Sequence, residues 1–319
     1  MDADSTFHLS SPRGAAMKTA LPAVCLIAAA VTLSFDNAPA ARPCTEADYQ
    51  VFSSGFSFPE GPAFDSEGNL YVVIYKREGD IARIKPDGET EVFIDLLSLG
   101  EGKANGMTYH PGQDALYACE YDGKRIIRID LKTKKVTTVA DSYEGKPLNS
   151  VNDIFLAANG ELYFSDPYRD DETTGGRVFC YSLAEGKLYK LLDGLAFPNG
   201  LTVSPDLRTL YVAQTVRRNV TAWTLSDNGH AVAGEGREVF LMTGGNGPDG
   251  IETDSKGNLF ISHYGGGKLY YVSPGGELLG CASGFGANLT NVEARGDWVY
   301  ITDAERGEVV RVPLSHFTQ

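Results

Sequence analysis

A phrase of short apolar runs and turns recurs six times along this chain of 319 residues, and it constrains the fold more than any other feature. Each copy opens on a residue whose side chain carries a carbonyl or carboxylate oxygen, passes through a Gly, Pro or Asn turn, and reaches a second apolar run such as Leu162-Tyr163-Phe164. The opening residues lie 45, 47, 47, 50 and 42 positions apart. They are Glu60, Asn105, Asn152, Asn199, Asp249 and Asn291.

This repeat predicts an all-β chain folded as a six-bladed β-propeller. A period of roughly 40 to 50 residues made of short strands and tight turns is typical of propeller blades. The 3.6-residue apolar spacing of helices is absent outside the N-terminus. We therefore expect one propeller domain over residues 41–319. Residues 49–56 read as a further strand, which would join the last repeat and close the ring without an exposed edge.

The first forty residues form a separate segment. Residues 20–35 are almost continuously apolar; Lys18 precedes this run, and Ala38-Pro39-Ala40 follows it. A basic residue, a short apolar run and an A-x-A sequence are typical of a secretory signal peptide. We predict a signal peptide over residues 1–40, with Met17 as an alternative start, and therefore a secreted or periplasmic protein. A buried helix is the alternative.

Charge and cysteine content restrict the partners and the covalent chemistry. The formal net charge is -14 at pH 7, which argues against nucleic acids and anionic membrane surfaces as partners. A small-molecule substrate fits better, and a monomer and a small homo-oligomer are both compatible. Beyond residue 40 the cysteines are Cys44, Cys119, Cys180 and Cys281. They allow three pairings, and buried free thiols are an equal alternative.

The six opening residues are the candidate metal ligands. In a propeller the innermost strand of each blade lines a central channel, so equivalent positions form a ring around its axis. Four amides and two carboxylates converging on one point suit a hard cation such as Ca²⁺, with Mg²⁺, Mn²⁺ or Zn²⁺ as alternatives. The His and Cys ligands of structural zinc sites are missing from the ring. The alternative is that Asn-Gly and Asp-Gly serve as ordinary turns.

A second set of polar residues follows the second apolar run of five copies. Some of these side chains are expected to point into the same end of the channel. Asp166 is a candidate general base, and Asp249 is an alternative that would also bind the metal. The second set consists of Glu120, Asp166, Gln214, His263 and Asp303.

Within this set, His263 and, more weakly, Glu120 are candidates for substrate contact, although a structural role for His263 is equally open. Residues 168–176 and 215–219 are expected to shape the channel mouth. No G-x-S-x-G or phosphate-binding glycine motif supports a serine hydrolase or nucleotide chemistry.

Several motifs resemble the gluconolactonase/regucalcin family of six-bladed propellers. They occur in the family's order across residues 50–312, as Glu60-Gly-Pro, Leu148-Asn-Ser-Val-Asn-Asp153, Tyr163-Phe-Ser-Asp-Pro167, Pro198-Asn-Gly-Leu201 and Pro248-Asp-Gly-Ile251. The resemblance implies a divalent metal, usually calcium, at the channel mouth, and hydrolysis of a lactone. The implied ligands are Glu60, Asn152, Asn199 and Asp249.

The resemblance also implies roles for individual asparagines. In some members the residue matching Asn152 contacts substrate or a metal-bound water instead of the metal. Asn105 matches an Asn-Gly of the bacterial gluconolactonase branch, and we expect it to contact substrate. That branch often has a histidine where this chain has Tyr121, a departure that bears on sugar-lactone specificity.

The leading hypothesis is a secreted or periplasmic, calcium-dependent lactonase. A phosphotriesterase-like hydrolase is an alternative, because the same metal site can hold a phosphoryl oxygen. A non-catalytic propeller that binds calcium or another ligand is a third hypothesis, since a fold does not determine a function.

Overall fold

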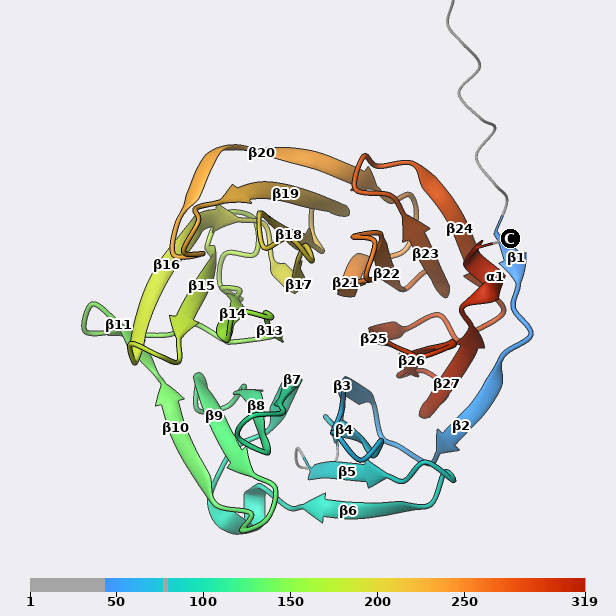
Figure 1. Ribbon diagram of the computed structural model, residues 1–319, viewed down its shortest axis with the longest axis horizontal. Helices are drawn as coiled ribbons and strands as arrows, with labels where there is room; N and C mark the ends of the chain where they lie inside the picture. Colours follow the sequence, from blue (N-terminus) through green and yellow to red (C-terminus); the bar gives the residue numbers. More distant parts are fainter. Residues whose placement is uncertain (1–43, 77–79, 319) are drawn as a thin grey trace, which may run out of the picture. The chain divides into compact units, whose positions relative to one another are not determined.

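The computed structural model describes residues 44–76 and 80–318, which form a six-bladed β-propeller (Figure 1). The all-β prediction is confirmed: helix in the described residues is confined to a 3-10 turn, η1 (Leu97–Leu99), and to α1 (Ser315–Thr318). The predicted signal peptide lies outside the described residues. In the described part of the chain, no helix is long and apolar enough to span a membrane.

Blades 1 to 3 each contain four antiparallel strands, and the first strand in sequence lies nearest the centre (Figure 1). Blade 1 contains β3 (Pro59–Phe64), β4 (Leu70–Ile74), β5 (Asp80–Ile84) and β6 (Thr90–Ile94). Blade 2 contains β7 (Ala104–His110), β8 (Ala115–Glu120), β9 (Arg125–Asp130) and β10 (Val136–Ala140). Blade 3 contains β13 (Ile154–Leu156), β14 (Glu161–Asp166), β15 (Gly176–Ser182) and β16 (Lys187–Leu195). A small hairpin, β11 (Ser142–Tyr143) and β12 (Lys146–Pro147), precedes blade 3.

Blades 4 to 6 complete the ring. Blade 4 contains β17 (Pro198–Val203), β18 (Thr209–Gln214), β19 (Asn219–Leu225) and β20 (Val232–Leu241). Blade 5 contains β21 (Gly247–Thr253), β22 (Leu259–Tyr264), β23 (Lys268–Val272) and β24 (Leu278–Ser283). Blade 6 contains β25 (Leu289–Arg295), β26 (Trp298–Asp303) and β27 (Glu308–Pro313).

The first described strands add to the outer edges of the last two blades. β1 (Thr45–Glu46) runs parallel to β24, and β2 (Gln50–Ser54) runs antiparallel to β27. A disulfide joins Cys44, just before β1, to Cys281 on β24. It is one of the pairings that the sequence left open, while Cys119 and Cys180 are buried free thiols. A disulfide that closes so long a loop stabilises mainly by restricting the unfolded chain.

The hydrophobic core lies between the blades and not inside a single layer. Six buried clusters each draw side chains from two neighbouring blades. For example, Val73 and Ile81 of blade 1 share a cluster with Leu116 and Ile127 of blade 2. Because both faces of a blade are covered by its neighbours, its inner strands read as nearly continuous apolar runs.

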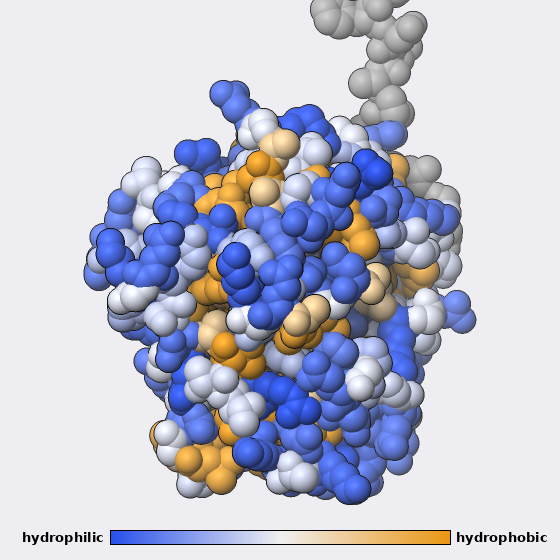
Figure 2. Space-filling model, turned by 60° about the vertical axis from the view of Figure 1, so that its left-hand side comes forward, coloured by the Kyte–Doolittle hydropathy of each residue, from blue (hydrophilic) through white to orange (hydrophobic). Residues whose placement is uncertain are grey.

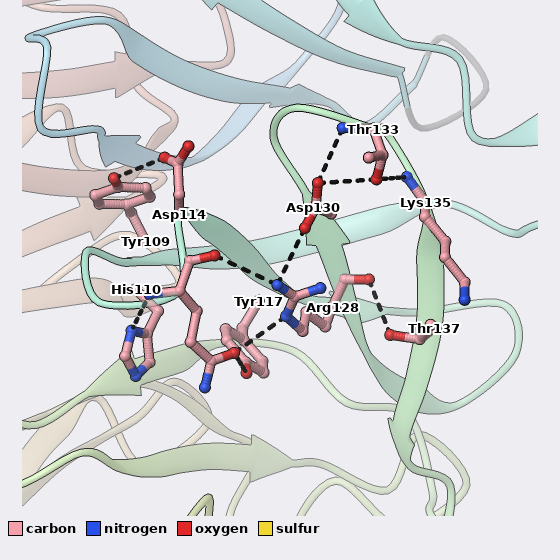
Figure 3. Close-up of polar contacts among 10 residues, drawn as sticks. Tyr109, His110, Asp114, Tyr117, Arg128, Asp130, Thr133, Lys135 and Thr137 are labelled. Atoms are coloured by element: carbon pink, nitrogen blue, oxygen red, sulfur yellow. Dashed lines mark hydrogen bonds and ion pairs between the residues drawn. The ribbon is translucent and has the colours of Figure 1, made fainter.

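Side chains fix the turns at the ends of the strands, as a network in blade 2 illustrates (Figure 3). Asp130 accepts hydrogen bonds from the backbone amide and the hydroxyl of Thr133, at 2.9 and 2.8 Å. Arg128 donates to the other Asp130 oxygen at 3.3 Å. Such short side-chain bonds to nearby backbone are the reason why Asp, Asn, Ser and Thr are frequent in turns.

The surface seen in Figure 2 is mostly hydrophilic, with apolar side chains in separate small areas. Seven large apolar residues of the described chain are exposed, and they come from several blades. Scattered exposed apolar residues are ordinary on a protein surface and do not by themselves indicate a docking site.

Glycines allow the innermost strands to approach one another closely at the axis. A Cβ atom on Gly200 would lie 2.4 Å from the backbone oxygen of Asp249, and one on Gly250 would lie 2.2 Å from Asn291 Oδ1. Gly61 and Gly106 meet the next blade in the same way. The glycine after a ring residue is therefore required by the close approach of the next blade.

We predict that Gly200→Ala lowers the free energy of unfolding by about 1–3 kcal/mol, the usual cost of overpacking. Gly275→Ala is the matched control, because Gly275 is exposed and an added Cβ there would meet only Ser273 Oγ at 3.6 Å. Denaturant unfolding of both variants checks this. Equal effects of the two substitutions would contradict the close-approach argument.

Candidate active site

A cavity of about 650 Å³ opens at one end of the central channel. The repeat predicted that all six ring residues lie at this end of the channel, and five of them line the cavity. They are Glu60, Asn105, Asn152, Asn199 and Asp249. The sixth, Asn291, instead lines a second cavity of about 370 Å³, where its amide donates to Asp153 Oδ2 at 3.3 Å.

The local backbone explains why these side chains reach the axis. In five blades the pairing between the first and second strands shifts register across the ring residue. In blade 3 the first strand begins only at Ile154, after Asn152 and Asp153. A β-bulge bends a strand locally and redirects a side chain, and bulges are common beside active sites. The repeated bulge thus orients the ring residues.

Two buried carboxylates dominate the electrostatics of the cavity. Burial, then the charges of Asp249 and Asp153, raise the pKa of Glu60 well above its usual value. Burial and the charge of Asp153 also raise the pKa of Asp249 well above its usual value. A hydrogen bond from the side-chain amide of Asn199 opposes this rise. In the described chain, neither carboxylate forms an ion pair with Lys, Arg or His.

A third buried acid, Asp153, lies deeper in the channel, and burial raises its pKa to about 6. Buried carboxylates without a cationic side chain are costly unless a cation compensates them. The ring residues beside Glu60 and Asp249 offer amide oxygens, and carboxylate and amide oxygens together are a ligand set of hard divalent cations. The residues present therefore fit such an ion.

The second set of polar residues anchors the loops that lead into the innermost strands. All five side chains are nearly inaccessible, and none of them lines the 650 Å³ cavity. Gln214 Oε1 accepts from the Ala196 amide at 3.1 Å, and Asp303 Oδ2 accepts from the Gly286 amide at 2.7 Å. In both blades the bonded amide belongs to the loop just before the first strand.

Asp166 holds the loop that carries Asn152. Its Oδ1 accepts from the backbone amides of Asn149 and Ser150, at 2.8 and 2.9 Å. Its Oδ2 pairs with Arg177 at 2.6 Å. Burial raises the pKa of Asp166, and Arg177 and the two amides oppose that rise. Both oxygens of the Asp166 carboxylate are thus engaged by groups of the protein itself.

Glu120 and His263 are also placed beneath the mouth instead of inside it. Glu120 pairs with Arg125 at 2.6 Å and accepts from the Gly123 amide at 2.9 Å. His263 Nε2 lies 3.1 Å from the carbonyl oxygen of Gly244, next to Gly245, which lines the cavity. Both contacts support loops, and neither side chain reaches the cavity in the described structure.

Sequence reasoning missed the aromatic residues of the mouth. Phe58 and Phe197 line the cavity, each two positions before a ring residue, and both have positive φ, 64° and 49°. Tyr75 and Tyr264 line it at the ends of the second strands. Bulky residues in the left-handed region are rare and cluster at functional sites. Inspecting the position two before each ring residue would have found both phenylalanines.

The two loops expected to shape the mouth do line it. Residues 168–176 contribute Arg169 and Glu172, and residues 215–219 contribute Thr215, Val216 and Arg218. The Arg169 guanidinium lies over the rings of Tyr121 and Phe197, with its central carbon 4.9 and 5.1 Å from the ring centroids. These cation–π contacts hold a positive charge at the edge of a site whose base is negative.

A family model described as the SMP-30/gluconolactonase/LRE-like region matches residues 58–293. The chain belongs to this family. A gluconolactonase of Zymomonas mobilis subsp. mobilis is 30% identical to this chain over 292 residues. The alignment covers 84% of this chain and 79% of the gluconolactonase. Lactonase drp35 of Staphylococcus aureus (strain USA300) is 26% identical over 225 residues, or 69% of this chain and 68% of its own.

Solved structures show the same fold at lower identity. A gluconolactonase from Xanthomonas campestris aligns with a TM-score of 0.72 at 23% identity, over 86% of this chain and 98% of its own. Regucalcin from Agrobacterium tumefaciens, described as a calcium-binding protein, aligns with a TM-score of 0.71 at 19% identity, over 85% of this chain and 95% of its own. The resemblance stated from the sequence motifs is therefore confirmed.

The Asp166–Arg177 pair of this family member can be tested by its effect on stability. We predict that Asp166→Asn lowers the free energy of unfolding by roughly 3 kcal/mol, because removing one partner of a buried pair leaves the other charge uncompensated. Asp193→Asn, in the exposed pair with Lys190, should cost less than about 1 kcal/mol. Arg177→Met and the double variant complete the cycle. Strictly additive costs would show that the two side chains do not interact.

Proposed function

We propose that this protein is a calcium-dependent lactonase whose active site is the cavity lined by Glu60, Asn105, Asn152, Asn199 and Asp249. One observation carries the proposal: five oxygen-bearing side chains from five different blades converge on the same cavity. Its relatives named gluconolactonase and lactonase support the reaction class. The calcium-binding description of the regucalcin neighbour agrees with the choice of ion.

The residues that would hold the ion are Glu60, Asn199 and Asp249, with Asn152 as a fourth ligand or as a contact to substrate. When bound, a divalent cation supplies Lewis-acid stabilisation to the carbonyl oxygen of the lactone. Asn105 lies at the same level of the ring and can donate its amide hydrogens to a ring or carbonyl oxygen of the substrate.

Asp249 is the residue to which we assign the general base. Ring opening needs a carboxylate that takes a proton from the attacking water. Asp249 lines the cavity, whereas Asp166 does not. Asp166 is buried against Arg177 and two backbone amides, so we assign it the positioning of the Asn152 loop.

The rim of the cavity suits a substrate that has an apolar part and that becomes an anion on hydrolysis. Phe58, Phe197 and Tyr264 line the cavity and offer apolar ring surface to a substrate. Hydrolysis of a lactone produces a carboxylate, and Arg169 and Arg218 place positive charge at the rim. Opposite charge at the exit favours formation of the anionic product.

We also propose that the protein is secreted or periplasmic. The predicted signal peptide of residues 1–40 supports export, and the Cys44–Cys281 disulfide supports an oxidising compartment.

Calcium should stabilise the protein through the ring carboxylates. At a free calcium concentration one hundred times the Kd, we expect about 2.7 kcal/mol of added stability. Glu60→Gln and Asp249→Asn should abolish the calcium-dependent rise of the melting temperature. Glu172→Gln should keep that rise, because Glu172 lies at the exposed rim of the same cavity. A rise that persists in Glu60→Gln and Asp249→Asn would refute the assigned ligands.

Hydrolysis of a lactone panel, followed as acid release, tests the reaction. We expect turnover that EDTA removes and calcium restores, and a loss of at least about a hundredfold in Asp249→Ala, the usual contribution of a general base. Glu67→Gln, at an exposed turn, controls for a general effect of losing a carboxylate. Turnover of phosphotriesters alone would instead favour the phosphotriesterase hypothesis. Calcium stabilisation without any turnover would favour a binding propeller.

A further inference from the structure

A second cluster of metal-ligating side chains lies away from the channel, where blade 3 meets blade 4. Glu161 is the first residue of β14, Cys180 lies in the middle of β15, and His230 lies in the turn between β19 and β20. Their ligand atoms all lie within 4.8 Å of one another. None of the three lines the 650 Å³ cavity or any part of the ring.

The geometry points to a transition-metal site: we propose that Glu161, Cys180 and His230 bind one Zn²⁺ ion that links blade 3 to blade 4. Sulfur, imidazole nitrogen and carboxylate oxygen together match the preferences of zinc and not those of calcium. Three protein ligands leave a fourth, tetrahedral position for water.

The distances between the ligand atoms agree with this assignment. Glu161 Oε2 lies 3.3 Å from His230 Nε2 and 3.5 Å from Cys180 Sγ. Around a tetrahedral zinc with bonds of roughly 2.0–2.3 Å, neighbouring ligand atoms lie about 3.3–3.6 Å apart. Two of the three pairs of ligand atoms thus lie close to the separation that a shared ion imposes, and the third pair lies within 4.8 Å.

His230 supplies an independent observation. Its side chain is only 9% exposed, yet its Nε2 atom is buried and makes no hydrogen bond in the described structure. The contact with Glu161 therefore lacks hydrogen-bond geometry despite its short distance. A buried ring nitrogen that lies 3.3 Å from a carboxylate oxygen without a hydrogen bond to it is accounted for by an ion between the two groups.

The surroundings hold each ligand in place. Ser182 donates to Glu161 Oε1 at 3.0 Å, and the Cys180 thiol donates to Oε2 at 3.5 Å, a bond that an ion would replace once the thiol loses its proton. The ring of Tyr189 stacks on His230 with centroids 4.1 Å apart. Glu185 Oε1 lies 4.0 Å from His230 Nδ1, on the side away from the cluster. Contacts of this kind orient the ligands in zinc sites.

The turn that carries His230 is also fixed. Asn228 Oδ1 accepts from the His230 amide at 3.2 Å, and Tyr163 donates to the carbonyl oxygen of Gly229 at 3.3 Å. Because Tyr163 belongs to blade 3, the turn from blade 4 is already held against the cluster. Binding requires loss of the Cys180 thiol proton to solvent, so one proton is released for each ion bound.

Cobalt titration of the metal-free mature protein tests the proposal. Co²⁺ bound by a thiolate gives a near-ultraviolet charge-transfer band, which oxygen ligands at the channel mouth do not give. We expect this band to saturate at one equivalent and to disappear when Zn²⁺ displaces Co²⁺. Cys180→Ser should abolish it. Cys119→Ser, which removes the other buried free thiol, should retain it.

Two further variants separate this site from the others. His230→Asn changes a turn residue and should weaken cobalt binding at least tenfold without unfolding the protein. Glu60→Gln should leave the band unchanged, so the result does not depend on the proposed function of the channel. Absence of the band in the wild-type protein, its persistence in Cys180→Ser, or unchanged affinity in His230→Asn would overturn the proposal.

Discussion

The close approach of the innermost strands at the axis is the constraint on which the rest of the structure depends. Four of the six ring residues are followed by glycine, and a Cβ at any of these glycines would collide with the next blade. In five blades a bulge at the ring position bends the first strand so that the neighbouring backbones can meet. The same bend directs an oxygen-bearing side chain toward the axis. The close packing of the blades at the axis and the orientation of the ring residues therefore have one geometric origin.

This geometry has an electrostatic consequence. It concentrates Glu60, Asp249 and Asp153 in a buried channel, where desolvation and mutual repulsion oppose their ionisation. A cation at the mouth would reverse both effects at once, so its binding free energy would be coupled to the stability of the fold. The two arginines lie at the rim and not at the base, which leaves the acids at the base free to bind a cation.

The repeat was sufficient to predict the six blades and the six ring residues, five of which line the cavity, because each copy carries its own strands, turn and axial residue. It was not sufficient to orient Glu120, Asp166 and His263. The register of a strand predicts the direction of a side chain but not whether a loop covers it. For all three residues, the loop that leads into the first strand of the blade lies over the side chain. The Cys44–Cys281 disulfide was equally beyond the repeat, because Cys44 precedes the first copy and its partner depends on where β1 docks.

The two proposed cation sites differ in the hardness of their donors, and this difference would determine how the propeller responds to metals. The ring residues at the channel mouth offer carboxylate and amide oxygens, which discriminate poorly against other hard ions and would bind calcium through carboxylate charge. The Glu161–Cys180–His230 cluster offers sulfur and nitrogen, which favour zinc. Zinc at the cluster would join β14 and β15 to the turn after β19, while calcium at the mouth would join ring residues of several blades. Each ion would thus cross-link blades at a different radius, one at the axis and one away from it, and chelators of different selectivity would remove them separately.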